Sequence, residues 1–162
     1  MVGFHNRGGN KLDQFIAVKG DVATRATASG RQVTLQLQLL NLTPATGLPQ
    51  YVQGPFPGTI GAAPGLYQAY AVFELPRFAG SIRLEVGKKK AKLVTAGPDG
   101  PSQVVATYVQ IPRGTSLSVV ATFTTPQSQR SLLFAPSARV PAIAWTAPGL
   151  AWSDDIARSV RW

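Results

Sequence analysis

A strict alternation of aliphatic and polar side chains between residues 33 and 39 constrains the fold most strongly. The aliphatic positions are Val33, Leu35, Leu37 and Leu39. Successive side chains of a β-strand point to opposite faces, so the pattern predicts a strand with one face in the core and one in water. Comparable alternation recurs at 67–75, 81–86 and 116–124.

Glycine and proline separate these segments, with 16 Gly and 13 Pro among 162 residues. Further strands are predicted at 15–27, 91–95, 103–111 and 131–134. About eight strands divided by turn residues are typical of a sandwich or barrel. The predicted fold is all-β, an antiparallel β-sandwich of immunoglobulin-like or jelly-roll-like type. Little helix is expected, no more than a turn or two at 154–160.

The chain is predicted to form one domain with two flanking segments. Residues 1–14 form an N-terminal segment expected to be mobile, 15–135 the β-sandwich domain, and 136–162 a Pro/Trp-containing tail expected to pack on it. Every tryptophan of the chain lies in this tail. Tryptophans here can fill gaps between sheets or present faces that stack on sugars. The Pro and Gly residues of this stretch favour the first interpretation.

A long Pro- and Gly-rich loop at 44–65 is a candidate working surface, because such loops are uncommon inside compact domains unless they are functional. It carries Tyr51 and Phe56. Tyr51 is therefore a candidate loop contact for a ligand. The alternative is that both aromatic rings cap an open end of the sandwich.

The sequence predicts no catalytic residue, no metal site and no cofactor. His5 is the single histidine and cysteine is absent, which removes the usual zinc ligands and thiol nucleophiles. A glycosidase needs two placed carboxylates, and the chain has seven scattered acidic residues. Asp154 and Asp155 are interpreted as caps of the expected short helix. Asn41-Leu42-Thr43 matches a glycosylation acceptor, a common chance triplet.

The charge balance favours anionic partners. Sixteen Lys and Arg stand against seven Asp and Glu, a net charge of +9. The densest basic patch is Lys88, Lys89, Lys90 and Lys92, at the tip of a predicted hairpin between 81–86 and 91–95. These lysines are the candidate site for an anionic polymer, although a solvated turn would look the same. Nucleic acid is not expected, because no aromatic residue interleaves with them.

An ordered series of short motifs carries a family resemblance. The series is Gly9-Asn10-Lys11-Leu12-Asp13, Gly47-Leu48-Pro49-Gln50-Tyr51-Val52, Pro57-Gly58, the strand after Gly65, and Ile111-Pro112-Arg113-Gly114-Thr115-Ser116-Leu117. From Asn10 to Phe123 the chain resembles the C-terminal β-rich region of large membrane-anchored envelope proteins of unknown function from actinobacteria. The resemblance implies an extracytoplasmic module whose parent is held by a tether that this sequence does not contain. The Trp-containing tail departs from the family pattern.

The predicted function is a non-catalytic binding or assembly module at the bacterial cell envelope. Its partner would be an anionic envelope polymer or another protein. One alternative is a structural protein of a virion or other assembly, with sandwiches packed edge to edge. A third is a carbohydrate-active enzyme that uses Asp13, Asp21 or Asp99. The ligand and the oligomeric state stay open. Strand order also stays open, since alternation shows which face of a strand is buried and not which strands are neighbours.

Overall fold

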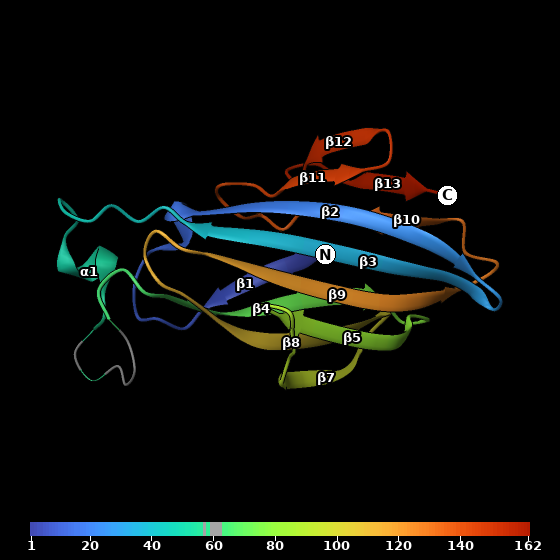
Figure 1. The fold of residues 1–162 in the computed structure, drawn as a ribbon, viewed down its shortest axis with the longest axis horizontal. Coiled ribbons are helices and arrows are strands. Elements are labelled where there is room, and N and C mark those ends of the chain that lie inside the picture. The colour runs from blue at the N-terminus through green and yellow to red at the C-terminus, as the bar shows by residue number, and fades with distance from the viewer. Residues whose placement is uncertain (57, 59–62) are drawn as a thin grey trace.

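The computed structural model describes residues 1–56, 58 and 63–162 and is nearly all β (Figure 1). Its helical elements are the 3₁₀ turn η1 (Asp13–Phe15) and the single-turn α1 (Gln50–Gln53). The strands are β1 (Val2–Asn6), β2 (Ile16–Thr27), β3 (Gly30–Asn41), β4 (Tyr67–Pro76), β5 (Gly80–Val86), β6 (Lys89–Lys90), β7 (Leu93–Asp99), β8 (Ser102–Ile111), β9 (Ser116–Pro126), β10 (Ser131–Phe134), β11 (Ala144–Ala147), β12 (Leu150–Ser153) and β13 (Arg158–Arg161).

Two larger sheets and one small sheet organise these strands. One has the order β1-β4-β8-β7, another the order β12-β11-β2-β3-β9-β5-β6, and β10 pairs with β13. All pairs are antiparallel except β11 with β2, which makes the seven-stranded sheet mixed. Figure 1 shows β2, β3 and β9 side by side, with β1 and β8 behind them. None of these sheets closes on itself.

Alternate residues of both larger sheets form one hydrophobic core. On β3 the four aliphatic positions of the 33–39 pattern are all buried, and on β4 the odd-numbered positions from Tyr67 to Leu75 are buried as well. Both sets belong to the same cluster, together with residues of β8 and β9. Each fully buried large side chain contributes roughly 1.5–3 kcal/mol through removal of apolar surface from water. The predicted strands at 33–39, 67–75, 103–111 and 116–124 are confirmed.

The ends of the chain differ from the sequence expectations. The described residues form thirteen strands, where about eight are predicted. The N-terminal segment is not mobile at Val2–Asn6, because β1 pairs with β4. The helix expected at 154–160 is wrong, since Arg158–Arg161 forms β13 and pairs with β10. Pairing with β10 satisfies the backbone polar groups of this segment, which a single helical turn would leave mostly unbonded.

The hairpin predicted between 81–86 and 91–95 is confirmed only near its turn, where β5 pairs with β6. After β5 the chain returns only as the two-residue strand β6. It then crosses to the other large sheet, where β7 pairs with β8. The alternation of these segments is compatible with either partner, so their pairing was not predictable from it.

The tail packs its tryptophans against the core. The rings of Trp145 and Trp152 stack with centroids 6.0 Å apart and planes 11° apart. Phe134 meets both rings edge to face, at 5.2 Å and 5.4 Å. Trp145 and Trp152 are buried, as the gap-filling interpretation predicts. Trp162 is half-buried, and Arg31 lies over its ring at 5.5 Å.

The long loop at 44–65 is only partly described. Pro57 and residues 59–62 lie outside the described residues, so Pro57 of the Pro57-Gly58 motif has no structural account. Arg113, beyond β8, holds the described part. Its guanidinium donates hydrogen bonds to the Ala45 carbonyl at 2.7 Å and the Gln53 side chain at 3.3 Å.

Candidate functional site

The outer face of the four-stranded sheet presents a row of polar and aromatic side chains. Tyr70 of β4 points outward, because its neighbours Ala69 and Ala71 are buried in the core. It lies opposite His5 on β1 and opposite Tyr108 on β8. Leu93 pairs with Thr107, so the next step along both chains brings Lys92 beside Tyr108. We call His5, Tyr70, Tyr108 and Lys92 the outer-face row.

Polar and ring contacts hold the row in place. The Tyr70 and Tyr108 rings meet edge to face, with centroids 6.0 Å apart and an interplanar angle of 64°. Gln110 donates a hydrogen bond from Nε2 to the Tyr108 hydroxyl at 3.1 Å. The Thr107 hydroxyl donates to the Lys92 carbonyl at 3.0 Å, which fixes the backbone that carries the lysine. Tyr108 keeps 39% of its surface exposed.

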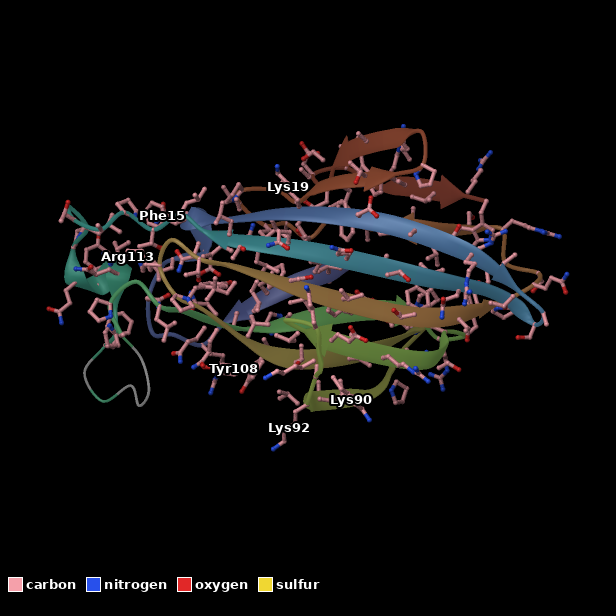
Figure 2. All side chains as sticks on the ribbon, in the orientation of Figure 1. Phe15, Lys19, Lys90, Lys92, Tyr108 and Arg113 are labelled. Atoms are coloured by element: carbon pink, nitrogen blue, oxygen red, sulfur yellow. The ribbon has the colours of Figure 1, made fainter. Side chains whose placement is uncertain are left out.

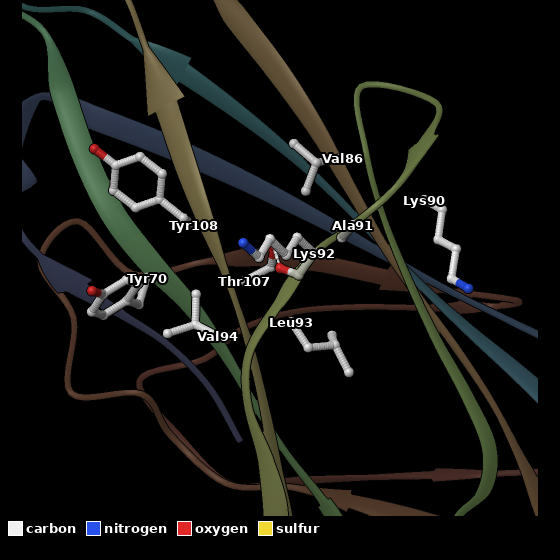
Figure 3. A pocket seen from close by; sticks show the side chains of 9 residues that line it. All are labelled: Tyr70, Val86, Lys90, Ala91, Lys92, Leu93, Val94, Thr107 and Tyr108. Atoms are coloured by element: carbon white, nitrogen blue, oxygen red, sulfur yellow. Dashed lines mark hydrogen bonds between the residues drawn. The ribbon is translucent and has the colours of Figure 1, made fainter. Parts of the chain in front are cut away.

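A groove of about 740 Å³ lies against this row (Figure 3). Its walls are the segment from β6 to β7 on one side and β4 and β8 on the other. The lining residues are Tyr70, Val86, Lys90, Ala91, Lys92, Leu93, Val94, Thr107 and Tyr108. The volume lies in the range of small-molecule sites. No carboxylate lines the groove, so its charged groups are all cationic.

A β-bulge at the start of β7 shapes the groove. Leu93 pairs with Thr107 and Thr95 with Ala106, which leaves Val94 as an extra residue in β7. Bulges redirect a side chain and end regular pairing. Here the bulge places Val94 against the groove, and the pairing of β7 with β8 ends at Thr107. Among the described strands, none pairs with the β7 side of β8 from Tyr108 onward.

The structure does not bring the four predicted lysines together. Lys90 lies opposite Glu85 on β5. Lys88 sits in the turn with φ of 68°, and Lys89 pairs with Val86. Figure 3 shows Lys92 pointing toward Tyr108, while Lys90 points away from the tyrosines. All four lysines are exposed, and Lys92 is the one that points toward a tyrosine of the groove.

Within the described residues the Lys92 ammonium group forms no hydrogen bond or ion pair. Figure 2 shows Lys92, Lys90 and Tyr108 along the side of the molecule that carries β7. The charge is thus available to a ligand in the groove.

Tyr51 lies elsewhere, on α1, and does not line the groove. Its ring is 56% exposed, and the Lys11 ammonium lies 5.6 Å from the ring centroid. Phe56 is 46% exposed. The loop aromatic and the lysines of the sequence analysis are therefore two separate surfaces.

Tyr70 and Tyr108 were not predicted as site residues from the sequence. Both are aromatic residues at outward positions of strands whose inward faces are apolar, and that signal was available. The sequence does not show that the two tyrosines are adjacent, because 38 positions separate them. Only the register of β4 with β8 brings them together. The statement that no aromatic residue accompanies the lysines holds along the chain but is wrong in space, since Tyr108 lies beside Lys92.

The acidic residues make local structural contacts. The Asp13 carboxylate accepts hydrogen bonds from the Tyr67 hydroxyl at 2.9 Å and from Asn6 at 2.7 Å. Asp21 accepts one from the Thr146 hydroxyl at 2.8 Å. Asp99 is the last residue of β7, in the four-stranded sheet. Asp154 is buried and accepts the Ile143 backbone N–H at 2.7 Å, so it caps no helix.

Burial perturbs two groups around Asp13. Burial, followed by the nearby Asp13 charge and hydrogen bond, raises the pKa of the Tyr67 hydroxyl well above its ordinary value. Burial also lowers the pKa of the Arg139 guanidinium. Arg139 donates to the carbonyls of Asp13 and Ile16, at 3.0 Å and 2.6 Å. These contacts fasten the tail to η1 and β2, which is a structural role.

The described residues contain no group of three or more His, Cys, Asp or Glu side chains placed to hold a metal ion. Among the same residues, no helix has the length and apolar character to cross a bilayer.

Comparisons with known proteins assign no family to the chain. No protein-family model matches it, and no curated protein does. A crystal structure with a related arrangement is that of a candidate nutrient-binding protein from Legionella pneumophila, with a TM-score of 0.42 and 8% sequence identity. The match covers 90% of this chain and 49% of that one, so the chain spans about half the length of that protein. A likeness at this TM-score carries no argument about function.

Proposed function

We propose that the protein is a non-catalytic β-sandwich module that binds an anionic polymer of the bacterial cell envelope, outside the cytoplasm. The groove beside the outer-face row carries the proposal, because it joins an unpaired ammonium group to an exposed tyrosine ring. The shared core of the two larger sheets supports the sandwich form. The resemblance to anchored actinobacterial envelope proteins supports the location.

Electrostatics favour a negatively charged ligand. The net charge is +9, and the groove lining adds two lysines without a carboxylate. A basic surface raises the local concentration of an anionic ligand, and added salt screens this attraction over a Debye length of about 8–10 Å. Tyr108 would add stacking or apolar contact that salt does not screen.

Two matched pairs of variants test the site, with affinity for purified cell-wall polymer measured by sedimentation. Lys92→Ser is compared with Lys89→Ser, which removes the same charge outside the groove. Tyr108→Ala is compared with Tyr51→Ala, which removes an exposed ring at α1. We expect Lys92→Ser and Tyr108→Ala each to weaken binding by roughly three-fold to ten-fold, about 0.7–1.4 kcal/mol, with near-normal binding by the controls.

If the two variants of each pair lost the same affinity for the polymer, the groove would be rejected as the binding site. If Tyr51→Ala alone weakened binding, the loop at α1 would be the contact surface instead. Thermal melting of each variant separates lost binding from lost folding.

An assembly role is the second candidate, and one observation favours it. β7 is exposed along its whole length, including Leu93 and Val94 at 44% and 50%. Exposed edge strands can pair with another chain, although proline on such an edge, as at Pro98, opposes pairing. Light scattering at rising concentration tests this role, which requires oligomers to form. A strict monomer at high concentration would reject it.

A further inference from the structure

Arg7 lies at the other end of the outer-face row from Lys92. It directly follows β1, and its backbone N–H donates to the Gln68 carbonyl on β4 at 2.7 Å. Its guanidinium lies 5.3 Å from the centroid of the Tyr70 ring. The side chain is exposed, and this ring contact is its only one within the described residues. A guanidinium over an aromatic face is held in place while its donors stay open to a ligand.

Two cations therefore flank the tyrosine pair. Arg7 stands on the β1 side of Tyr70, and Lys92 stands on the β7 side of Tyr108. Neighbouring strands lie about 4.8 Å apart, so three strand spacings separate β1 from the Lys92 position by roughly 14 Å. This is the distance between the two backbones. The Arg7 guanidinium lies over Tyr70 and Lys92 points toward Tyr108, so the two rings lie between the two cationic side chains.

We infer that the binding surface extends across the sheet from Lys92 to Arg7 and takes an acidic oligosaccharide, with one sugar ring on Tyr108 and acidic groups toward both cations. This inference rests on the proposed function and names its ligand class. Arg7 becomes a binding residue for the second acidic group, since guanidinium pairs with carboxylates and sulfates through two parallel hydrogen bonds. Gln110 supplies an amide beside the Tyr108 ring, and His5 supplies an imidazole beside Tyr70.

The arrangement of the rings favours a sugar over a single-stranded nucleic acid. Proteins that bind single strands stack successive bases on successive aromatic side chains. Here Arg7 covers the Tyr70 ring, and the edge-to-face contact turns Tyr70 and Tyr108 out of a common plane. Tyr108 is the more exposed ring of the pair, so the row offers a platform for one unit. The Gln110 amide next to that ring suits sugar hydroxyls.

Calorimetric titration of the full chain tests the inference with four probes. They are galacturonic acid, tetragalacturonate, a sulfated heparin tetrasaccharide, and a single-stranded oligonucleotide of the same charge. We expect at least one of the tetrasaccharides to bind about ten-fold tighter than the monosaccharide, because it reaches both cations. The two tetrasaccharides distinguish carboxylate from sulfate as the acidic group.

Arg7→Ser is the decisive variant, with Arg158→Ser as its control, since Arg158 is an exposed arginine on β13. Arg7→Ser is expected to weaken tetrasaccharide binding about three-fold to ten-fold and leave binding of the monosaccharide unchanged. The slope of log affinity against log salt should fall by about 1, as for the loss of one ionic contact.

Three outcomes would overturn the inference. If Lys92→Ser weakens tetrasaccharide binding and Arg7→Ser does not, the proposed groove stands and its extension to Arg7 fails. Tighter binding of the oligonucleotide than of both tetrasaccharides would reject the sugar class. If the protein bound cell-wall polymer but neither tetrasaccharide, the acidic oligosaccharide would also be rejected as the ligand class. Circular dichroism melting of Arg7→Ser confirms that the variant is folded.

Discussion

Gly20, in the middle of β2, is required by the ring that packs on it. It faces the core between Val18 and Val22, and a Cβ atom at this position would overlap the indole of Trp145. The tryptophans of the tail therefore need a strand position without a side chain. Gly20 thus leaves the space that the Trp145 ring fills.

Replacing Gly20 with alanine should destabilise the protein. The added methyl must displace the Trp145 ring, and overpacking of this kind costs about 1–3 kcal/mol of unfolding free energy. Urea denaturation followed by tryptophan fluorescence measures the loss. Gly97→Ala in exposed β7 is the matched control, because a Cβ there meets no atom within 4 Å. Equal stability of the two variants would contradict the packing account.

Tyr67 gives a pH dependence at alkaline pH. Its hydroxyl is buried and donates to Asp13, which raises its pKa in the folded state. In the unfolded chain tyrosine ionises near pH 10, at about its ordinary pKa. The folded state thus retains this proton more strongly, so its contribution to stability is fully present below about pH 10 and is lost as pH rises further.

The Tyr67→Phe variant isolates this effect. Wild-type unfolding free energy should fall more steeply between about pH 9.5 and pH 11.5 than that of the variant, which lacks the titrating hydroxyl. Denaturant titrations at a series of pH values measure both slopes. Parallel curves would mean that Tyr67 does not couple ionisation to folding.

At the scale of elements, Asn41 joins the end of β3 to two other segments. Its Nδ2 donates to the Gly65 carbonyl at 2.9 Å and the Ile111 carbonyl at 2.8 Å. Its Oδ1 accepts the Thr43 backbone N–H at 3.0 Å. The side chain is fully buried, so the glycosylation triplet at 41–43 offers no accessible acceptor in the folded protein.

Changing Asn41 to aspartate should cost roughly 2–5 kcal/mol of stability. The carboxylate removes both donated hydrogen bonds and places a charge beside two carbonyl oxygens in a buried site. Gln38→Glu adds the same charge on the exposed face of the same strand and should change stability little. Thermal and urea unfolding of the two variants measure the difference. A loss below about 1 kcal/mol for Asn41→Asp would show that this junction is not required.

The elements that the sequence predicts well are those with long, regular alternation. β3, β4, β8 and β9 each run ten or more residues, and their inward faces are apolar. The errors fall where pairing partners decide the structure. The partner of β7 and the strand character of β13 depend on β8 and β10, which lie near them only in the fold.

The site was predictable only in part for the same reason. The run of lysines is enough, from the sequence alone, to predict an exposed basic turn. The selection of Lys92 over Lys90 depends on the crossover between sheets and on the bulge at Val94. Tyr70, Tyr108 and Arg7 join it through strand register, which alternation does not encode.

At the scale of the whole molecule, the central claim is that a basic face with an aromatic platform binds an anionic envelope polymer. The seven acidic residues leave a net charge of +9, while the groove carries its cations without a carboxylate. Charge would bring the polymer to the surface, and the outer-face row would position it. Such binding has both a salt-sensitive and a salt-resistant part.

Co-sedimentation of the purified protein with insoluble bacterial cell-wall polymer across a salt series tests this claim most directly. We predict that the protein pellets with the polymer at low salt, that binding weakens steeply as salt rises, and that Lys92→Ser has a shallower salt dependence than Lys89→Ser. Absence of the protein from the pellet at every salt concentration would contradict the account and leave the assembly role as the better explanation.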